Sequence, residues 1–224
     1  MEDKIKELFE TFDGEEIKYQ IDRAKGFISY YKCAILEIET KFRVLSEQFS
    51  VSFSRNPIEA IKTRLKTSES IGNKLLKKGF PLTLRSIEEN LFDVAGIRVI
   101  CTYVDDIYNL ADCLLSQDDI KLIRKKDYIK NPKDNGYRSL HLIVEIPIFL
   151  VGEKKYVKAE IQLRTVSMES WSNVEHSLCY KKELSSELAL EARKKLLEYA
   201  NACYNIDLDM QALREKIEDD LHNA

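Results

Sequence analysis

Two acidic side chains stand among many basic ones in the middle of the chain, and this pattern suits phosphoryl chemistry. Asp93 precedes Gly96 and Arg98 at the start of a β-branched run, and Glu160 lies within an alternating run. Two carboxylates that face one cleft can hold Mg²⁺, which also binds substrate phosphates. Each acid alone would more often be a surface or capping residue. Together with the nearby Lys and Arg residues, they predict a reaction that depends on positioning and charge neutralisation.

A loop rich in cations, from Lys126 to His141, is the second feature. Asn135 and Gly136 follow Pro132, a pattern typical of a tight turn, and Tyr137 comes next. Lysine and arginine suit phosphate oxygens, and an aromatic face suits a nucleobase. We interpret the loop as a nucleotide-binding segment, although basic hairpin loops also occur without such a role.

Alternating strands would bring these groups to one surface. The patterns predict strands over residues 58–66, 97–103, 120–125, 140–148 and 157–163, and helices over 68–78 and 105–116, with Ser68 as the N-cap of the first helix. Strands interleaved with helices predict a mixed α/β sheet. A solvated outer face is the usual reason for such alternation, but Ser139, His141 and Gln162 on these faces suit recognition better than solubility.

Long helices are predicted at both ends of the chain. Apolar side chains recur at helical spacing from Ile17 to Phe49 and from Leu196 to Ile217. Each stripe needs a partner, which can be either the same domain or another subunit, and the pattern alone favours neither. Because the catalytic segment looks complete without these helices, we expect them to form a subunit interface, which charged substitutions at Ile35 and Phe42 should dissociate.

Composition limits the possible classes of protein. The formal net charge of −3 places any anion-binding function in a local cluster, and a 44% hydrophobic, 33% charged chain can form an ordinary core. The five cysteines form no CxxC pair, which predicts reduced thiols. No apolar run approaches the roughly 18 residues of a membrane span, and the charged N-terminus, with no apolar stretch after it, predicts no signal peptide. We therefore expect a soluble cytoplasmic protein.

The motifs resemble, in order, the synthetase domain of the RelA/SpoT family, and in particular its stand-alone small alarmone synthetases. The resemblance covers roughly residues 56–182 and is carried by Arg64-x-Lys66-x-x-x-Ser70-Ile71-x-x-Lys74-Leu75, Asp93-x-x-Gly96-x-Arg98, the segment from Lys126 to His141, Glu160-Ile161-Gln162-Leu163-Arg164-Thr165, and Met168, Trp171, Glu175 and His176. It implies a nucleotidyltransferase-like α+β fold with a mixed sheet of about five strands. The whole chain, 1–224, would be one synthetase domain, with N-terminal helices over 1–55, a catalytic core over 56–182 and C-terminal helices over 183–224.

The resemblance also implies an activity, that of a GTP pyrophosphokinase in stringent-response signalling. With Mg²⁺, the enzyme would transfer the β,γ-pyrophosphoryl group of ATP to the ribose 3′-hydroxyl of GDP or GTP, releasing AMP. The family's multidomain members carry a hydrolase domain with a His-Asp metal site; with few residues ahead of the core and only three histidines, we expect this chain to make the alarmone and not to degrade it. The small members suggest a homotetramer.

Residue roles follow from the same resemblance, motif by motif. Arg64 and Arg98 would enclose the adenine of ATP, and its phosphates would be held by Lys66, Ser70, Lys74 and Lys126, with Lys77 a weaker candidate. Asp93 and Glu160 would be the catalytic residues and would bind Mg²⁺. Tyr137 would stack on guanine, with Lys133, Asn135, His141, Gln162 and Glu175 around the acceptor nucleotide.

Two other functions fit parts of this pattern. Some small members of the family instead pyrophosphorylate the 3′ end of tRNA and act as toxins. The acidic balance of the chain, including Glu218, Asp219 and Asp220, argues against the broad basic surface that tRNA needs. A non-catalytic nucleotide-binding or RNA-binding regulator is the other alternative, and the intact Asp93 and Glu160 argue against it. Nucleic acid would thus be a partner only as a regulator or in these alternatives.

Overall fold

A mixed five-stranded sheet forms the centre of the molecule. The computed structural model describes residues 14–52, 55–179 and 186–223. The strands are β1 (Ile58–Leu65), β2 (Ala95–Cys101), β3 (Lys121–Asp127), β4 (Leu140–Leu150) and β5 (Glu153–Thr165). Their order across the sheet is β1-β2-β5-β4-β3, with β2 and β5 parallel and the other neighbours antiparallel. The α+β class, the mixed sheet and all five predicted strands are confirmed, with shifts of a few residues at their ends.

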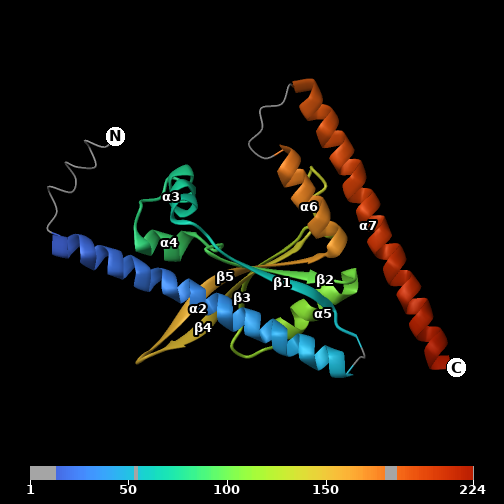
Figure 1. The fold of residues 1–224 in the computed structure, drawn as a ribbon, viewed down its shortest axis with the longest axis horizontal. Helices are drawn as coiled ribbons and strands as arrows, with labels where there is room; N and C mark the ends of the chain where they lie inside the picture. The colour runs from blue at the N-terminus through green and yellow to red at the C-terminus, as the bar shows by residue number, and fades with distance from the viewer. Residues whose placement is uncertain (1–13, 53–54, 180–185, 224) are drawn as a thin grey trace.

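Helices cover one side of this sheet and flank the other (Figure 1). They are α2 (Gly14–Ser52), α3 (Ser68–Lys77), α4 (Leu84–Asn90), α5 (Val104–Leu115), α6 (Val166–Cys179) and α7 (Ser186–Asn223). Sequence patterns did not predict α4, which is short, or α6, which carries weak apolar periodicity. Among the described residues, no helix combines the length and hydrophobicity that crossing a membrane requires.

Helix α2 packs its apolar stripe onto the sheet of its own protomer. Ile38 and Phe42 are fully buried, and Tyr31, Ile35 and Leu45 are nearly so. Ile17 and Ile21 of the predicted stripe lie outside the described side chains. The expectation that α2 forms a subunit interface through Ile35 and Phe42 is therefore wrong, because a charge there would enter the core of the protomer and unfold it.

Helix α7 differs, because only part of its stripe is covered. Leu196 and Ala200 pack against Trp171 of α6, whose indole Nε1 donates to the Leu196 carbonyl at 2.8 Å. Further along, Met210 and Ile217 are more than half exposed. The α7 stripe thus packs within the protomer at one end and leaves an apolar surface at the other.

Charged side chains tie α7 to the start of α5. Arg214 on α7 lies 2.8 Å from Asp105, and Arg55 makes two hydrogen bonds with the buried Asp106 at 2.7 and 2.9 Å. The guanidinium groups of Arg55 and Arg214 both lie against the ring of Tyr103. Both carboxylates lie in the first turn of α5, where their negative charge complements the helix dipole.

The cap of α3 corrects one local prediction. Thr67, rather than Ser68, has the extended backbone of an N-cap, and its hydroxyl accepts a hydrogen bond from the Ser70 amide at 3.2 Å. Ser68 is the first residue inside the helix. Both are good capping residues, so the helix start moves by only one position.

Candidate active site

One row of polar side chains crosses all five strands. The register pairs Lys62 with Arg98, Arg98 with Gln162, Gln162 with His141, and His141 with Lys126. Paired residues on neighbouring strands share a face of a sheet. The alternating residues, such as Ile161, point to the helix-covered side and are buried. The predicted polar face is therefore real, and residues far apart in sequence meet on it.

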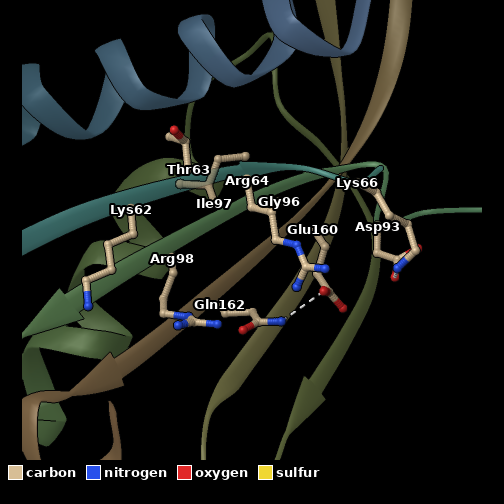
Figure 2. A pocket seen from close by; sticks show the side chains of 10 residues that line it. All are labelled: Lys62, Thr63, Arg64, Lys66, Asp93, Gly96, Ile97, Arg98, Glu160 and Gln162. Carbon is tan, nitrogen blue, oxygen red and sulfur yellow. Dashed lines mark hydrogen bonds and ion pairs between the residues drawn. The ribbon is translucent and has the colours of Figure 1, made fainter. Parts of the chain in front are cut away.

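A second row lies one step along the strands and contains Glu160. Here Arg64 pairs with Gly96, Gly96 with Glu160, Glu160 with Ile143, and Ile143 with Arg124. Gly96 presents no side chain between Arg64 and Glu160, so the space above it stays open, and a Cβ there would lie 3.4 Å from the Arg64 carbonyl oxygen. Figure 2 shows Arg64, Glu160 and the two central residues of the first row, Arg98 and Gln162, on the same side of the strands.

Two adjoining cavities open on this face. The larger has a volume of about 420 Å³, and its lining includes Lys62, Arg64, Lys66, Asp93, Arg98, Glu160 and Gln162. The smaller, of about 130 Å³, is lined in part by Lys74, Asp93, Arg124, Lys126, His141 and Glu160. Asp93 and Glu160 line both, so the two carboxylates stand at the junction of the cavities.

Asp93 is held between two ammonium groups. Its Oδ2 lies 3.0 Å from Lys66 Nζ and 2.7 Å from Lys74 Nζ. Burial opposes its ionisation, but these hydrogen bonds and charges outweigh burial and lower the pKa of Asp93 below its usual value. Its Oδ1 is buried and has no hydrogen-bond partner among the described residues. One oxygen of an ionised carboxylate is thus left to a ligand.

Glu160 has two neighbours from the first row. Gln162 donates from Nε2 to Oε2 at 2.9 Å, and His141 Nδ1 lies 3.4 Å from Oε1. Burial opposes ionisation of Glu160 most strongly, yet the contacts with His141 and Gln162 lower its pKa overall. The charge of Asp93 acts in the opposite direction, as two carboxylates near one another must. A cation at the junction of the cavities would relieve this repulsion.

Glu169, on α6, gathers the cations at the other end of the face. Its side chain is buried and accepts from Lys62 and Arg98 at 3.0 Å and from Arg164 at 3.1 Å. Burial raises its pKa, but these three cations lower it more. Sequence reasoning missed both Glu169 and the buried Arg164 as supports of the site. The available signal was weak: Glu169 lies between the apolar Met168 and Trp171, and both side chains are buried.

The loop before β4 forms a separate cluster next to the cavities. Lys133 Nζ lies 4.6 Å from the centre of the Tyr137 ring and 4.8 Å from that of Tyr128. Asn135 donates to Glu175 of α6 at 3.3 Å. Tyr137 joins the cluster to the cavities, because its hydroxyl lies 2.8 Å from His141 Nε2.

Helix α7 supports this loop from behind. Gly136 has a φ of +90°, and a Cβ there would lie 2.6 Å from Ala200 Cβ. Arg138 donates to Asn201 at 3.0 Å and stacks on Tyr204, with 4.2 Å from Cζ to the ring centre, while its other nitrogen donates to the Ile129 carbonyl at 2.9 Å. The shape of the loop therefore depends on the position of α7.

Most of the predicted site residues fall into these two groups. Arg64, Lys66, Lys74, Asp93, Arg98, Lys126, His141, Glu160 and Gln162 line the cavities, whereas Lys133, Asn135, Tyr137 and Glu175 belong to the loop cluster. Ser70 lines neither cavity and accepts a hydrogen bond from Thr67 at 2.9 Å. The expectation that Ser139 serves recognition is wrong, since it is fully buried and donates to the Leu163 carbonyl at 3.1 Å.

Comparison with known proteins gives a consistent result. Residues 63–185 match the family model described as a region found in RelA/SpoT proteins. The GTP pyrophosphokinase YwaC of Bacillus subtilis is 38% identical over 204 residues, which cover 91% of this chain and 96% of that protein.

Solved structures agree with this match in fold. The small alarmone synthetase 2 of Bacillus subtilis aligns with a TM-score of 0.76 and 39% identity, covering 86% of this chain and 98% of that one. Small alarmone synthetase 1 from the same organism, bound to its product pppGpp, aligns with a TM-score of 0.77 and 31% identity, covering 88% and 99%. The chain belongs to the RelA/SpoT family.

Proposed function

We propose that this protein is a GTP pyrophosphokinase that synthesises a guanosine alarmone. It transfers the β,γ-pyrophosphoryl group of ATP to the 3′-hydroxyl of GDP or GTP and releases AMP. One observation carries the proposal: two ionised carboxylates, Asp93 and Glu160, stand at the junction of two cavities lined by cations. Relatives that align over nearly the whole chain are named for this activity.

We assign Mg²⁺ to Asp93 and Glu160. The buried Oδ1 of Asp93 lacks a hydrogen-bond partner among the described residues, and the two acids repel one another, so both fit a shared cation. No cluster of three or more potential metal ligands occurs among the described residues. Two protein carboxylates suffice for Mg²⁺, because it retains waters and binds substrate phosphates. When bound, the ion would neutralise charge on the transferred phosphates.

The larger cavity would receive ATP. Arg64 and Arg98 project from neighbouring strands into it, and planar guanidinium groups stack well on an adenine ring. Lys66, Lys74 and Lys126 surround the carboxylates and would bind the phosphates, with Ser70 near the start of α3. In the structure the ammonium groups of Lys66 and Lys74 pair with Asp93. The triphosphate of ATP would therefore bind beside cations that Asp93 already holds in place.

The loop cluster would receive the guanosine nucleotide. Tyr137 offers the ring for stacking, and Lys133 lies against that ring now, so Lys133 must move aside or extend to a phosphate when the base enters. Asn135 and Glu175 are already hydrogen-bonded to one another at the edge of the cluster. His141 and Gln162 connect it with the cavities.

Catalysis would depend on alignment more than on a strong base. The lowered pKa of Glu160 keeps it ionised but makes it a weak base. We therefore assign Glu160 to orienting the 3′-hydroxyl and accepting its proton as the oxygen bonds to the β-phosphorus. The bond from that phosphorus to the bridging oxygen breaks, and AMP leaves with the electron pair.

We further propose that the whole chain is one synthetase domain acting as a homo-oligomer in the cytoplasm, with a homotetramer as the expected form. The apolar side chains of α7 that the protomer leaves exposed, including Met210, Leu213 and Ile217, would pack against a second copy of this chain. Sedimentation equilibrium at micromolar concentration measures the assembly.

The decisive experiment is incubation of the protein with ATP, Mg²⁺ and, separately, GDP, GTP and tRNA. We expect 3′-pyrophosphorylated GDP or GTP together with AMP. Glu160→Gln, which preserves shape but removes the charge, should lower the rate by about a thousandfold or more. Glu145→Gln is the matched control, because Glu145 lies on neighbouring β4 and lines neither cavity. Transfer of the pyrophosphoryl group to tRNA in place of GDP and GTP would overturn the proposal. Normal turnover by Glu160→Gln would overturn it as well.

A further inference from the structure

A buried arginine links the two groups of site residues without lining either cavity. The Arg164 side chain, on β5, is only 3% exposed. Its Nη1 donates to Glu169 at 3.1 Å, and its Nη2 donates to the Tyr137 hydroxyl oxygen at 2.6 Å and to Gln162 at 2.8 Å. A guanidinium group can only donate, so the Tyr137 oxygen must be an acceptor in this contact.

The contacts of His141 then restrict where its proton lies. Nδ1 is 3.4 Å from Glu160 Oε1, and Nε2 is 2.8 Å from the Tyr137 oxygen. An ionised carboxylate can only accept, so a hydrogen bond to Glu160 requires the proton on Nδ1. In a neutral ring, Nε2 is then an acceptor, and Tyr137 can donate its hydroxyl hydrogen to it. With a neutral ring, this arrangement gives Arg164, Tyr137, His141 and Glu160 compatible donors and acceptors.

We propose that Arg164 is a positioning residue that, through the Tyr137 hydroxyl, fixes the Nδ1–H tautomer of His141 and so keeps Glu160 aligned. Glu169 holds Arg164 in place, and the same carboxylate binds Arg98 on the larger cavity. The Tyr137 ring and its hydroxyl therefore serve separate purposes: the ring faces the loop cluster, and the hydroxyl belongs to the chain of contacts. The assignment of a catalytic consequence rests on the function proposed for Glu160.

Nitrogen-15 NMR of the histidine rings tests the tautomer without any nucleotide. The chain has three histidines, so a variant with His176→Gln and His222→Gln reports on His141 alone. We expect the proton on Nδ1 in this background. Adding Tyr137→Phe should give a mixture of tautomers, and adding Arg164→Lys should do the same, because a single ammonium cannot reproduce the fork that contacts Glu169 and Tyr137 together. A proton on Nε2 in the starting variant, or spectra unchanged by Tyr137→Phe, would overturn the proposal.

Kinetics test the consequence for transfer. Tyr137→Phe retains the aromatic face, so KM for the acceptor should stay within about twofold while kcat falls about tenfold to a hundredfold. Arg164→Lys should act in the same direction, and the double variant should be no slower than the slower single variant, because both changes break one chain of contacts. Additive losses, or losses confined to KM, would contradict this positioning role of Arg164.

The two readouts separate this inference from the proposed function. A wild-type protein that transfers nothing to GDP or GTP overturns the function, while the NMR spectra still decide the tautomer. Melting temperatures of the variants, measured alongside, identify any loss of rate that follows from unfolding. Tyr137→Phe removes only one oxygen and provides the test in which the fold is least disturbed.

Discussion

The two ends of the site are built in different ways. At the ATP end, Arg64 and Arg98 project from paired strands, so backbone hydrogen bonds of the sheet fix their spacing. At the acceptor end, Tyr137 follows a loop whose shape is set by contacts with α7, such as that between Gly136 and Ala200. Sheet register is strongly specified where one face of the sheet is buried, whereas a loop that packs against a single helix can be displaced by a single substitution. The acceptor end should therefore be the easier one to damage selectively.

Gly136→Ala should have the largest selective effect. The residue has φ of +90°, and its new Cβ would lie 2.6 Å from Ala200 Cβ, so the strain and the contact act together. Left-handed backbone costs a residue with a Cβ about 1–3 kcal/mol. Displacement of the loop should lower kcat/KM for GDP or GTP by about tenfold to a hundredfold, while calorimetry with a non-hydrolysable ATP analogue should show near-normal binding.

Gly152→Ala provides the matched control for this variant. Gly152 has a φ of +80° in the turn between β4 and β5, and its Cβ would have no atom within 4 Å. It carries similar backbone strain without a clash and away from the loop. Equal kinetic losses in the two variants would mean that general destabilisation, rather than the contact with α7, is responsible.

Tyr137→Ala should have the next largest effect. It deletes the ring proposed to stack on guanine, and base–aromatic stacking contributes about 1–3 kcal/mol per base. Acceptor affinity should fall by roughly fivefold to a hundredfold and ATP-analogue affinity much less, as measured by calorimetry for each nucleotide separately. If both affinities fall equally, the loop has been assigned to the wrong nucleotide.

The difference between the two ends also explains what the sequence could predict. Alternation predicted polar strand faces that include His141 and Gln162, and the register shows that these two residues form one row with Arg98 and Lys62. It could not predict that Glu169 binds the cations at the end of this row, because a single acid in a helix has no distinctive spacing. Contacts of that kind depend on how α6 leaves the end of β5, which is a matter of tertiary structure.

The terminal helices show the same limit. Both carry apolar stripes of similar length, and the pattern alone did not distinguish intramolecular packing from a subunit interface. The structure buries Ile38 and Phe42 of α2 completely but leaves Met210 and Ile217 of α7 more than half exposed. Which stripe is covered depends on the sheet surface available, and α2 occupies that surface.

The smallest expected effect is on stability, and it concerns Asp207, which attaches α7 to the end of β5 beside the acceptor end of the site. This buried carboxylate accepts from Thr165 at 2.6 Å, and burial raises its pKa above the usual value despite hydrogen bonds from Thr165 and Ser167. A raised pKa means that the folded state favours the protonated form, so the cost of this group to stability begins as the pH rises through the ordinary aspartate value and is complete above the raised pKa. Asp207→Asn keeps an acceptor for Thr165 without the buried charge and should raise Tm at pH 7 by about 2–4 °C. The gain in Tm should shrink as the pH falls and vanish below the ordinary aspartate value of 3.8.

Asp209→Asn, at an exposed position two residues along α7, is the control and should show no such trend. A pH-independent gain, or a loss of Tm at pH 7, would mean that the ionised carboxylate itself holds α7 against the end of β5.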